Sequence, residues 1–380
     1  MSASAVPATQ YRPDIDGLRA VAVLGVVLFH AFPTVFPGGF VGVDVFFVIS
    51  GFLITRIILA DHDGGQFSLF HFYARRIRRI FPALSVVLFA CMVVGWQVLL
   101  ANEFAELGMH VVAGAGFLSN LALWKESGYF DTASELKPLL HLWSLGIEEQ
   151  FYIVWPCVVW LAYRVNSRLL WITGLVFLIS WGWNVFTVGH DPVSAFYLPY
   201  CRAWELLMGA GLALIRKTPI ANVPCWTHQY RDQIAALGLM LIGVSMVVLN
   251  KDSLFPGGWA LLPTLGAALL IASEGAWVNR HVLSTKVLVG VGLISYPLYL
   301  WHWPLLSFAR IVENQELSVM RRTALVLIAV MLSAFTYRYV ERFLRHRGWV
   351  TTLMLVLLMS VLGLAGWNVY SRDGLEFRYR

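Results

Sequence analysis

Residues 17–36, GLRAVAVLGVVLFHAFPTVF, are apolar at nearly every position. About 20 apolar residues are enough to cross the hydrocarbon core of a bilayer as an α-helix. The stretch nevertheless carries Arg19 near its start and His30 in its depth. Eleven residues make three helical turns, so both side chains face the same way, about 16 Å apart along the axis. The spacing alone is equally compatible with a functional pair and with a snorkelling arginine beside a histidine satisfied between helices.

The composition of the whole chain is that of a membrane protein. Of its 380 residues, 58% are hydrophobic and 13% are charged, and the mean hydropathy is +0.68. Soluble domains carry roughly 25% charged residues. Sixteen tryptophans and fourteen tyrosines suit a protein anchored at two membrane interfaces. We therefore expect an all-α, polytopic transmembrane helix bundle.

Twelve segments are long and apolar enough to be considered as spans. They are 17–36, 39–59, 82–101, 104–124, 140–163, 168–187, 195–215, 232–249, 257–273, 287–308, 322–340 and 349–370. The fourth is the weakest, because it contains Glu106, His110, Asn120 and three glycines. Polar, glycine-broken backbone is tolerated at membrane depth only inside protein or along a cavity. We therefore expect about 11 spans plus one re-entrant or interfacial segment.

The distribution of basic residues fits eleven spans. With the N-terminus in the cytoplasm, 18 of the 28 lysines and arginines fall inside and 9 outside, as the positive-inside rule predicts. The same count explains the net charge of +6 as membrane topology, without a nucleic-acid partner. We expect a multi-pass membrane protein whose C-terminus lies on the outer side of the membrane. Four cysteines without paired spacing predict no disulfide framework and no metal site.

A basic amphipathic stretch, FHFYARRIRRIF at 70–81, precedes the third span. Its arginines form two i,i+3 pairs, Arg75 with Arg78 and Arg76 with Arg79. Anchoring to anionic lipid would explain them. Paired guanidinium groups are also suited to binding phosphates.

Three further segments place ionisable groups inside spans. HLWSLGIEEQFYIVWP at 141–156 contains His141, Glu148 and Glu149, and the first two share a helix face. A polar clasp to an arginine is the structural alternative for these glutamates. SYPLYLWHWPLL at 295–306 holds His302 between two tryptophans, where a satisfied histidine in an aromatic belt is favoured slightly. Asp44 begins the second span and could orient His30, since carboxylates often fix an imidazole tautomer.

Arg202 and Glu205, in YCRAWELLMGA, read as an internal ion pair. No Walker A, GxGxxG, GxSxG or HExxH motif is present. Any chemistry must therefore come from the intramembrane polar groups.

These blocks together resemble the acyltransferase 3 family of bacterial membrane O-acyltransferases. The matching blocks run in order from YRPDIDGLRAVAVLGVVLFHAF to ISYPLYLWHWP, over residues 11–304. The family's arginine–ten residues–histidine pattern falls on Arg19 and His30. Its R-x-x-R motif falls on one of the two arginine pairs at 75–79, and its fifth-span glutamate falls on Glu148 or Glu149.

The resemblance implies transfer of an acyl group, usually acetyl, from cytoplasmic acetyl-CoA to a hydroxyl of a surface glycan such as lipopolysaccharide O-antigen. The acceptor would be a glycan or lipid-linked saccharide reached from the lipid bilayer. Many members carry a periplasmic SGNH domain, which this sequence lacks beyond the junction GLEFRYR. The chain thus resembles the membrane half of such a two-domain enzyme. The resemblance implies a bacterial inner-membrane protein with a periplasmic C-terminus, in which a transmembrane acyltransferase domain at 1–345 is followed by an extra span and the start of a periplasmic junction at 346–380.

The residues fit this chemistry on their own, since a thioester and an alcohol need a base or a nucleophile. The expected roles fall into three sets. His30 is the base or acyl relay, supported by Glu148, Glu149 and Asp44; Arg19, Arg75, Arg76, Arg78 and Arg79 bind coenzyme A; Trp124, Tyr129, His141 and His302 line the substrate end. A transporter or flippase would also carry intramembrane Arg, Glu and His, but such proteins often show inverted repeats, which are not visible here. A non-catalytic receptor is the third alternative.

Overall fold

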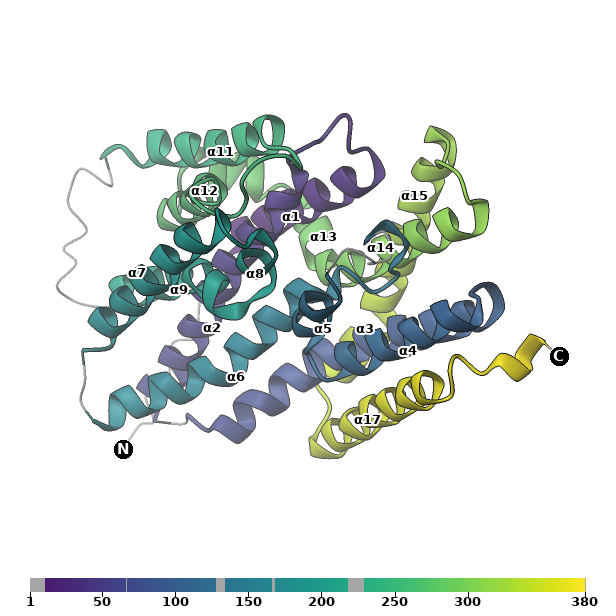
Figure 1. Cartoon of the computed structure of the whole chain (residues 1–380). Coiled ribbons are helices and arrows are strands. Elements are labelled where there is room, and N and C mark those ends of the chain that lie inside the picture. The colour runs from purple at the N-terminus through teal and green to yellow at the C-terminus, as the bar shows by residue number, and fades with distance from the viewer. Residues whose placement is uncertain (1–10, 66, 128–133, 166–167, 218–228, 380) are drawn as a thin grey trace. The chain divides into compact units, whose positions relative to one another are not determined.

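A computed structural model describes residues 11–65, 67–127, 134–165, 168–217 and 229–379 (Figure 1). Within these residues every regular element is a helix and none is a strand, which confirms the expected all-α class. The main helices are α1 (Pro13–Ala31), α2 (Gly42–Asp63), α3 (Leu69–Val98), α4 (Ala101–Ala115), α5 (Ser119–Glu126), α6 (Leu142–Arg164), α7 (Leu169–Val188), α8 (Pro192–Tyr197), α9 (Pro199–Lys217), α11 (Arg231–Val248), α12 (Leu261–Ala272), α13 (Lys286–Leu293), α14 (Ser295–Glu313), α15 (Val319–Phe335), α16 (Arg342–Arg345) and α17 (Trp349–Ser371). Short 3₁₀ turns lie at Gly39–Val41, Ser134–Leu136 and Glu376–Tyr379, and π-helical turns at Asn279–Leu283 and Thr336–Glu341.

Six described helical stretches are long and apolar enough to cross a membrane. They are Gly39–Asp63, Leu69–Val98, Leu169–Val188, Arg231–Val248, Val319–Arg345 and Trp349–Ser371. Four other helices of similar length, α1, α6, α9 and α14, are not among them. Each of the four carries buried or half-buried polar residues that the sequence singled out, such as His30 on α1 and Glu149 on α6. The polar groups that mark a candidate site are therefore the same groups that weaken the hydropathy signal.

The chain divides into two compact units. The first comprises Met1–Gly25, Pro37–Phe72 and Phe151–Leu293. In it α2 packs on α9, α9 packs on α7, and α11 packs on α12. The α2–α9 contact is close, because a Cβ atom at Gly51 would collide with the backbone carbonyl of Leu206. Glycine at this position lets the two helix backbones meet.

A buried ion cluster also joins α2 and α9 in the first unit. The Arg202 guanidinium lies 2.9 Å from Asp44 Oδ1 and 3.2 Å from Glu205 Oε1, and the three side chains are 0–1% exposed. The predicted Arg202–Glu205 pair is thus confirmed. Asp44, which the sequence analysis expected to orient His30, also belongs to this cluster.

The second unit comprises Val26–Phe36, Tyr73–Gln150 and Ile294–Arg380. In it α4 packs on α17 and α14 packs on α15 (Figure 1). A Cβ at Gly108 would crowd the carbonyl of Gly366, so here too glycines allow two helices to approach closely. The apolar core of this unit is built mainly from α3, α4 and α17, with contributions from α14 and the start of α6.

Three predicted segments differ from the structure in their boundaries. The basic stretch 70–81 and the third span form one continuous helix, α3, with Pro82 inside it. The weak segment 104–124 is broken into α4 and α5, because the chain turns at Phe117 with a φ of 56°. Segment 287–308 is broken at Ile294, between α13 and α14, whereas its two prolines, Pro297 and Pro304, both lie within α14.

Candidate functional site

His30 lies in the last turn of α1, and its ring is hydrogen-bonded to a second histidine. His30 Nδ1 is 2.9 Å from His302 Nε2, on α14. The other ring nitrogen of His302, Nδ1, is 3.1 Å from the Leu298 carbonyl oxygen one turn earlier. A carbonyl can only accept, so Nδ1 of His302 carries a proton, and Nε2 of neutral His302 is an acceptor. His30 therefore donates from Nδ1, which puts the lone pair of a neutral His30 on Nε2.

The surroundings of this histidine pair fix its position. The two imidazole rings stack with centroids 5.2 Å apart, and the Trp303 ring lies 4.4 Å from His30. Arg310 donates to the His30 carbonyl at 2.8 Å, and Arg322 donates to the Ala31 carbonyl at 3.4 Å. The last carbonyls of a helix have no partner within the helix and carry its negative dipole end. The two arginines therefore satisfy the end of α1 directly behind His30.

A third imidazole, His141, lies beside the pair. Its ring centroid is 5.8 Å from that of His302 and 5.4 Å from that of Tyr299, and the residue is 2% exposed. The Tyr299 hydroxyl donates to the His141 carbonyl at 2.7 Å, and Ser144 lies 2.6 Å from the same hydroxyl. Neither ring nitrogen of His141 has a hydrogen-bond partner within the described residues. The structure thus brings together His30, His141 and His302, which are far apart in sequence.

These imidazoles do not share a metal-like geometry. Among the described residues, no group of three or more His, Cys, Asp and Glu side chains is arranged to hold a metal ion. Two of the rings instead bond directly to each other. His302 thus holds the His30 ring through a direct hydrogen bond.

Glu149 lies where α6 passes the basic part of α3. It is 7% exposed, and the charges of Arg76 and Arg79 act on its carboxylate. Glu148, its half-buried neighbour, interacts electrostatically with Glu149 and with Tyr299. The two acidic residues of α6 therefore interact electrostatically with arginines of α3 and with Tyr299 of α14.

The four arginines at 75–79 are not equivalent. Arg78 donates to Thr352 Oγ1 on α17 at 2.9 Å. Arg75 is exposed, whereas the side chains of Arg76 and Arg79 reach the charge of Glu149. Of the two pairs that the sequence left open, Arg75/Arg78 and Arg76/Arg79, the second supplies the charges that act on Glu149.

Two predicted site residues belong to the other unit. Arg19 forms an ion pair with Asp16 at 3.3 Å, one turn earlier on α1. Asp44 was expected to orient His30, and this is not what the hydrogen bonds show. Its Oδ1 accepts from Arg202, and His30 Nδ1 is held by His302. The burial of Asp44 gives the physical reason: a carboxylate that is 0% exposed needs a full countercharge, which an imidazole without a charge cannot supply.

Two further residues were expected at the substrate end. Trp124 lies on α5 and is 37% exposed. Tyr129 lies outside the described residues.

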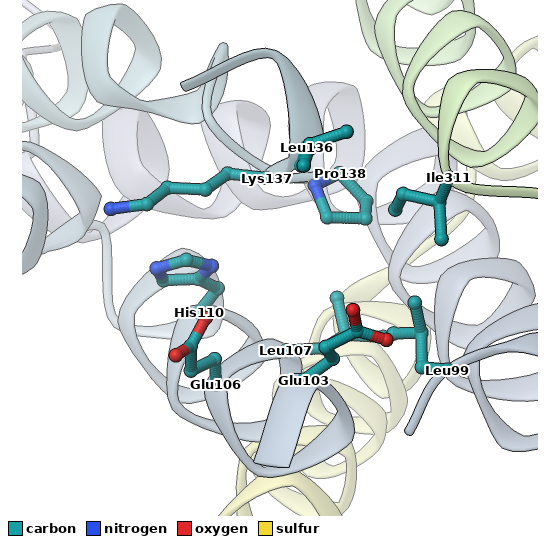
Figure 2. Close-up of a pocket in the computed structure, with 9 residues that line it drawn as sticks. All are labelled: Leu99, Glu103, Glu106, Leu107, His110, Leu136, Lys137, Pro138 and Ile311. Carbon is teal, nitrogen blue, oxygen red and sulfur yellow. The ribbon is translucent and has the colours of Figure 1, made fainter. Parts of the chain in front are cut away.

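A second polar cluster, His110–Glu126–Lys137, was not assigned a role from the sequence. Glu126 Oε2 is 2.8 Å from His110 Nε2 and 3.0 Å from Lys137 Nζ. Burial opposes ionisation of Glu126, but the hydrogen bonds and charges of His110 and Lys137 prevail, so the pKa of this carboxyl lies below its ordinary value. His110 and Lys137 border a pocket between α4, the segment after Ser134–Leu136 and α14 (Figure 2). The one feature of the sequence that could have indicated this cluster is the polar content of segment 104–124, which contains His110.

The family and the relatives that this chain matches are all named for acyl transfer. The family described as "Acyltransferase domain" matches residues 12–338. A peptidoglycan O-acetyltransferase, OatA, of Listeria monocytogenes is 31% identical over 358 residues, covering 90% of this chain and 57% of the relative. A Staphylococcus aureus protein named "Putative O-acetyltransferase" is 31% identical over 398 residues, which cover 96% of this chain and 65% of the relative. A Bacillus subtilis protein named "Putative peptidoglycan O-acetyltransferase YrhL" is 32% identical over 359 residues, which cover 89% of this chain and 56% of the relative.

The chain spans less than two thirds of the length of each of these relatives. No solved structure matches the chain.

Proposed function

From the premise that this chain belongs to the acyltransferase family, we propose that it is a membrane O-acetyltransferase that moves an acetyl group from cytoplasmic acetyl-CoA to a hydroxyl of a cell-surface glycan. The observation that carries the proposal is the His30–His302 hydrogen bond at 2.9 Å. It leaves the lone pair of neutral His30 on Nε2, the state that a general base needs.

The proposed reaction uses the free-energy advantage of a fixed His30 tautomer in one transfer step. His30 Nε2 takes the proton of the acceptor hydroxyl as its oxygen attacks the thioester carbonyl. The new C–O bond forms, the C–S bond breaks, and the proton passes from His30 to the sulfur of coenzyme A. During this step His302 holds the Nδ1 proton and thereby keeps the ring in one orientation. An acetyl group carried transiently by His30 is the other form of the same reaction, and trapping labelled acetyl on the protein distinguishes the two.

The donor site is proposed at the arginine end of α3. Coenzyme A carries its phosphates far from its thioester, so a phosphate site must lie well away from the base. Arg76 and Arg79 are the best candidates, because their charges act on Glu149 of α6, whereas Arg75 is exposed. Glu149 would balance the positive charge of both guanidinium groups before the phosphates arrive.

For the acceptor, the names of the relatives favour peptidoglycan over lipopolysaccharide O-antigen. Both offer sugar hydroxyls, and the base described above does not distinguish them. We propose a peptidoglycan glycan strand or its lipid-linked precursor as the acceptor to test first, at the outer face of a bacterial inner membrane crossed about eleven times, with the N-terminus in the cytoplasm.

The test is transfer of labelled acetyl from acetyl-CoA to peptidoglycan or lipopolysaccharide in membranes containing the protein. His30→Ala should abolish transfer, and His190→Ala, an exposed histidine outside the site, should leave it unchanged. Retention of near-normal transfer by His30→Ala would refute the catalytic assignment. A glycan that crosses the membrane without gaining acetyl would support the transporter alternative.

The donor site has its own matched pair. Arg76→Ala should weaken acetyl-CoA binding strongly, and Arg75→Ala, one residue away on the exposed face of the same helix, should weaken it much less. Equal effects of the two variants would indicate general attraction of the basic helix and no specific phosphate contact.

A further inference from the structure

Helix α14 contacts His30 at three points. His302 Nε2 accepts a hydrogen bond from the imidazole, and the centroid of the Trp303 ring lies 4.4 Å from that of His30. Arg310 donates to the backbone carbonyl of His30 at 2.8 Å. Because seven residues make about two helical turns, Trp303 and Arg310 share a face of α14. All four residues belong to the second unit. One helix therefore holds both the ring and the backbone of the proposed base.

The backbone of His30 needs a partner because α1 ends one residue later. The last carbonyls of a helix lack the N–H donors of a following turn, and Pro33 has no N–H to donate. The amides of residues 35 and 36 both donate to the Phe32 carbonyl. Arg310 takes the place of the missing backbone donor at the His30 carbonyl. The last turn of α1 thus depends on a side chain of α14.

The burial of Arg310 separates it from an arginine that only anchors a helix at the membrane surface. The residue is half-buried, and its guanidinium carbon lies 5.6 Å from the centre of the Trp303 ring. Its Nη1 atom is buried and makes no hydrogen bond within the described residues. Removing part of a guanidinium group from water is costly, whereas an anchoring arginine extends its charged head into water. The contact that Nη2 makes with the His30 carbonyl gives a reason for this cost.

Two neighbouring arginines make different contacts. Arg322 donates to the next carbonyl of α1 at 3.4 Å, and it also lies 3.6 Å from Glu316, whose side chain is 96% exposed. Arg321 is exposed and forms an ion pair with Glu313. Arg310 thus makes the shorter of the two contacts to the end of α1, and Arg321 offers an arginine of the same region for a matched control.

We propose that Arg310 is a positioning residue for His30, which holds the last turn of α1 so that Nε2 of the imidazole stays aligned with the acceptor hydroxyl. Arg310 contacts the backbone of His30 and takes no proton in the reaction. His302 fixes the ring of the base, and Arg310 fixes its backbone. The inference rests on the proposed function for the reaction that the contact serves.

The first experiment measures kcat and the KM values for acetyl-CoA and for the glycan in Arg310→Met. Methionine keeps a long side chain but removes the donors and the charge. Loss of a hydrogen bond from a charged donor should lower kcat by about 10- to 100-fold, with both KM values nearly unchanged. Arg310→Lys keeps a cationic donor and should recover part of the rate, and Arg321→Met should change none of the three constants. An unchanged kcat in Arg310→Met, or a loss confined to KM, would refute the positioning role.

The second experiment needs no acetyl transfer. Hydrogen exchange of the purified protein is followed at residues 28–32, where the Phe32 amide donates to the Leu28 carbonyl at 2.7 Å. Exchange there should be about 10- to 100-fold faster in Arg310→Met and unchanged in Arg321→Met. Equal exchange in the wild type and in Arg310→Met would overturn the proposal, whatever the effect on kcat.

Exchange in α4 and α17, which pack on each other, reports on the rest of the second unit in the same samples. If it also becomes faster in Arg310→Met, that variant unfolds the unit and Arg310→Lys decides. The lysine variant should loosen the last turn of α1 less than methionine does and leave α4 and α17 unchanged, and the absence of any local change would overturn the proposal. If the wild type transfers no acetyl group but Arg310→Met loosens only the last turn of α1, the contact stands and the proposed reaction falls.

Discussion

Replacing His302 by phenylalanine should slow acetyl transfer without removing the proposed base. The variant keeps a flat ring at a position that is 1% exposed, but it removes the acceptor that lies 2.9 Å from His30 Nδ1. The His30 N–H donor then loses its partner, and its ring is no longer held in one tautomer. A donor left unsatisfied in a partly buried site costs about 1–2 kcal/mol. If that cost falls on the productive geometry, kcat should drop by about 5- to 30-fold.

The assay is acetyl transfer to peptidoglycan in membranes, with kcat and the two KM values measured separately. Since His302 acts through His30, the loss should appear in kcat, and the pH dependence of kcat should shift with the altered imidazole. His302→Gln offers an amide oxygen that can accept from Nδ1, so it should recover part of the rate. If His302→Phe keeps kcat within twofold of the wild type and has the same pH profile, the histidine pair is only a packing contact.

Three further predictions concern the first unit. Gly51→Ala places a Cβ against the Leu206 carbonyl and should destabilise the protein by about 1–3 kcal/mol, whereas Gly174→Ala, with open space around it, should be neutral or slightly stabilising in the same thermal unfolding assay. Arg202→Met should cost about 3–5 kcal/mol, because it leaves two buried carboxylates without a countercharge; a loss below about 1 kcal/mol would contradict this. For Asp14 burial opposes ionisation, but Arg12 and Asn279 outweigh it and lower its pKa. A lowered folded-state pKa stabilises the fold at neutral pH, and this contribution is lost as the pH falls below 3.8 and through the folded value. Asp14→Asn should therefore flatten the acid limb of the stability curve, and an unchanged limb would refute the argument.

The sequence located the polar residues of the second unit better than their partners. His30, His141 and His302 were each identified because an imidazole inside an apolar segment stands out. Their contacts could not be predicted, since His30 and His302 are separated by 272 residues and meet only through the packing of α1 and α14. Asp44 was assigned to His30 because the two are close along the chain. Burial of Asp44 instead required a full positive charge, which Arg202 supplies.

The predicted helix boundaries were wrong for a different reason. The basic stretch 70–81 and the apolar stretch after it differ in composition, so they were treated as separate elements. The structure joins them in α3 because nothing between them breaks a helix: Pro82 falls within the helix without ending it. Composition reports the environment of a residue, and helix ends are set by backbone geometry, as at Phe117.

Two buried polar clusters, one in each unit, follow the same physical rule. Burial of a polar group is costly unless it is hydrogen-bonded. Arg202 meets this cost with two carboxylates, and His30 meets it with His302. His141 does not, because neither of its buried ring nitrogens has a partner in the described residues although it lies next to His302. If His141 only filled space, an apolar ring of the same shape would do so without the cost of desolvating two ring nitrogens. We therefore propose that His141 contacts a group that is present only during the reaction, as expected of a residue at the substrate end.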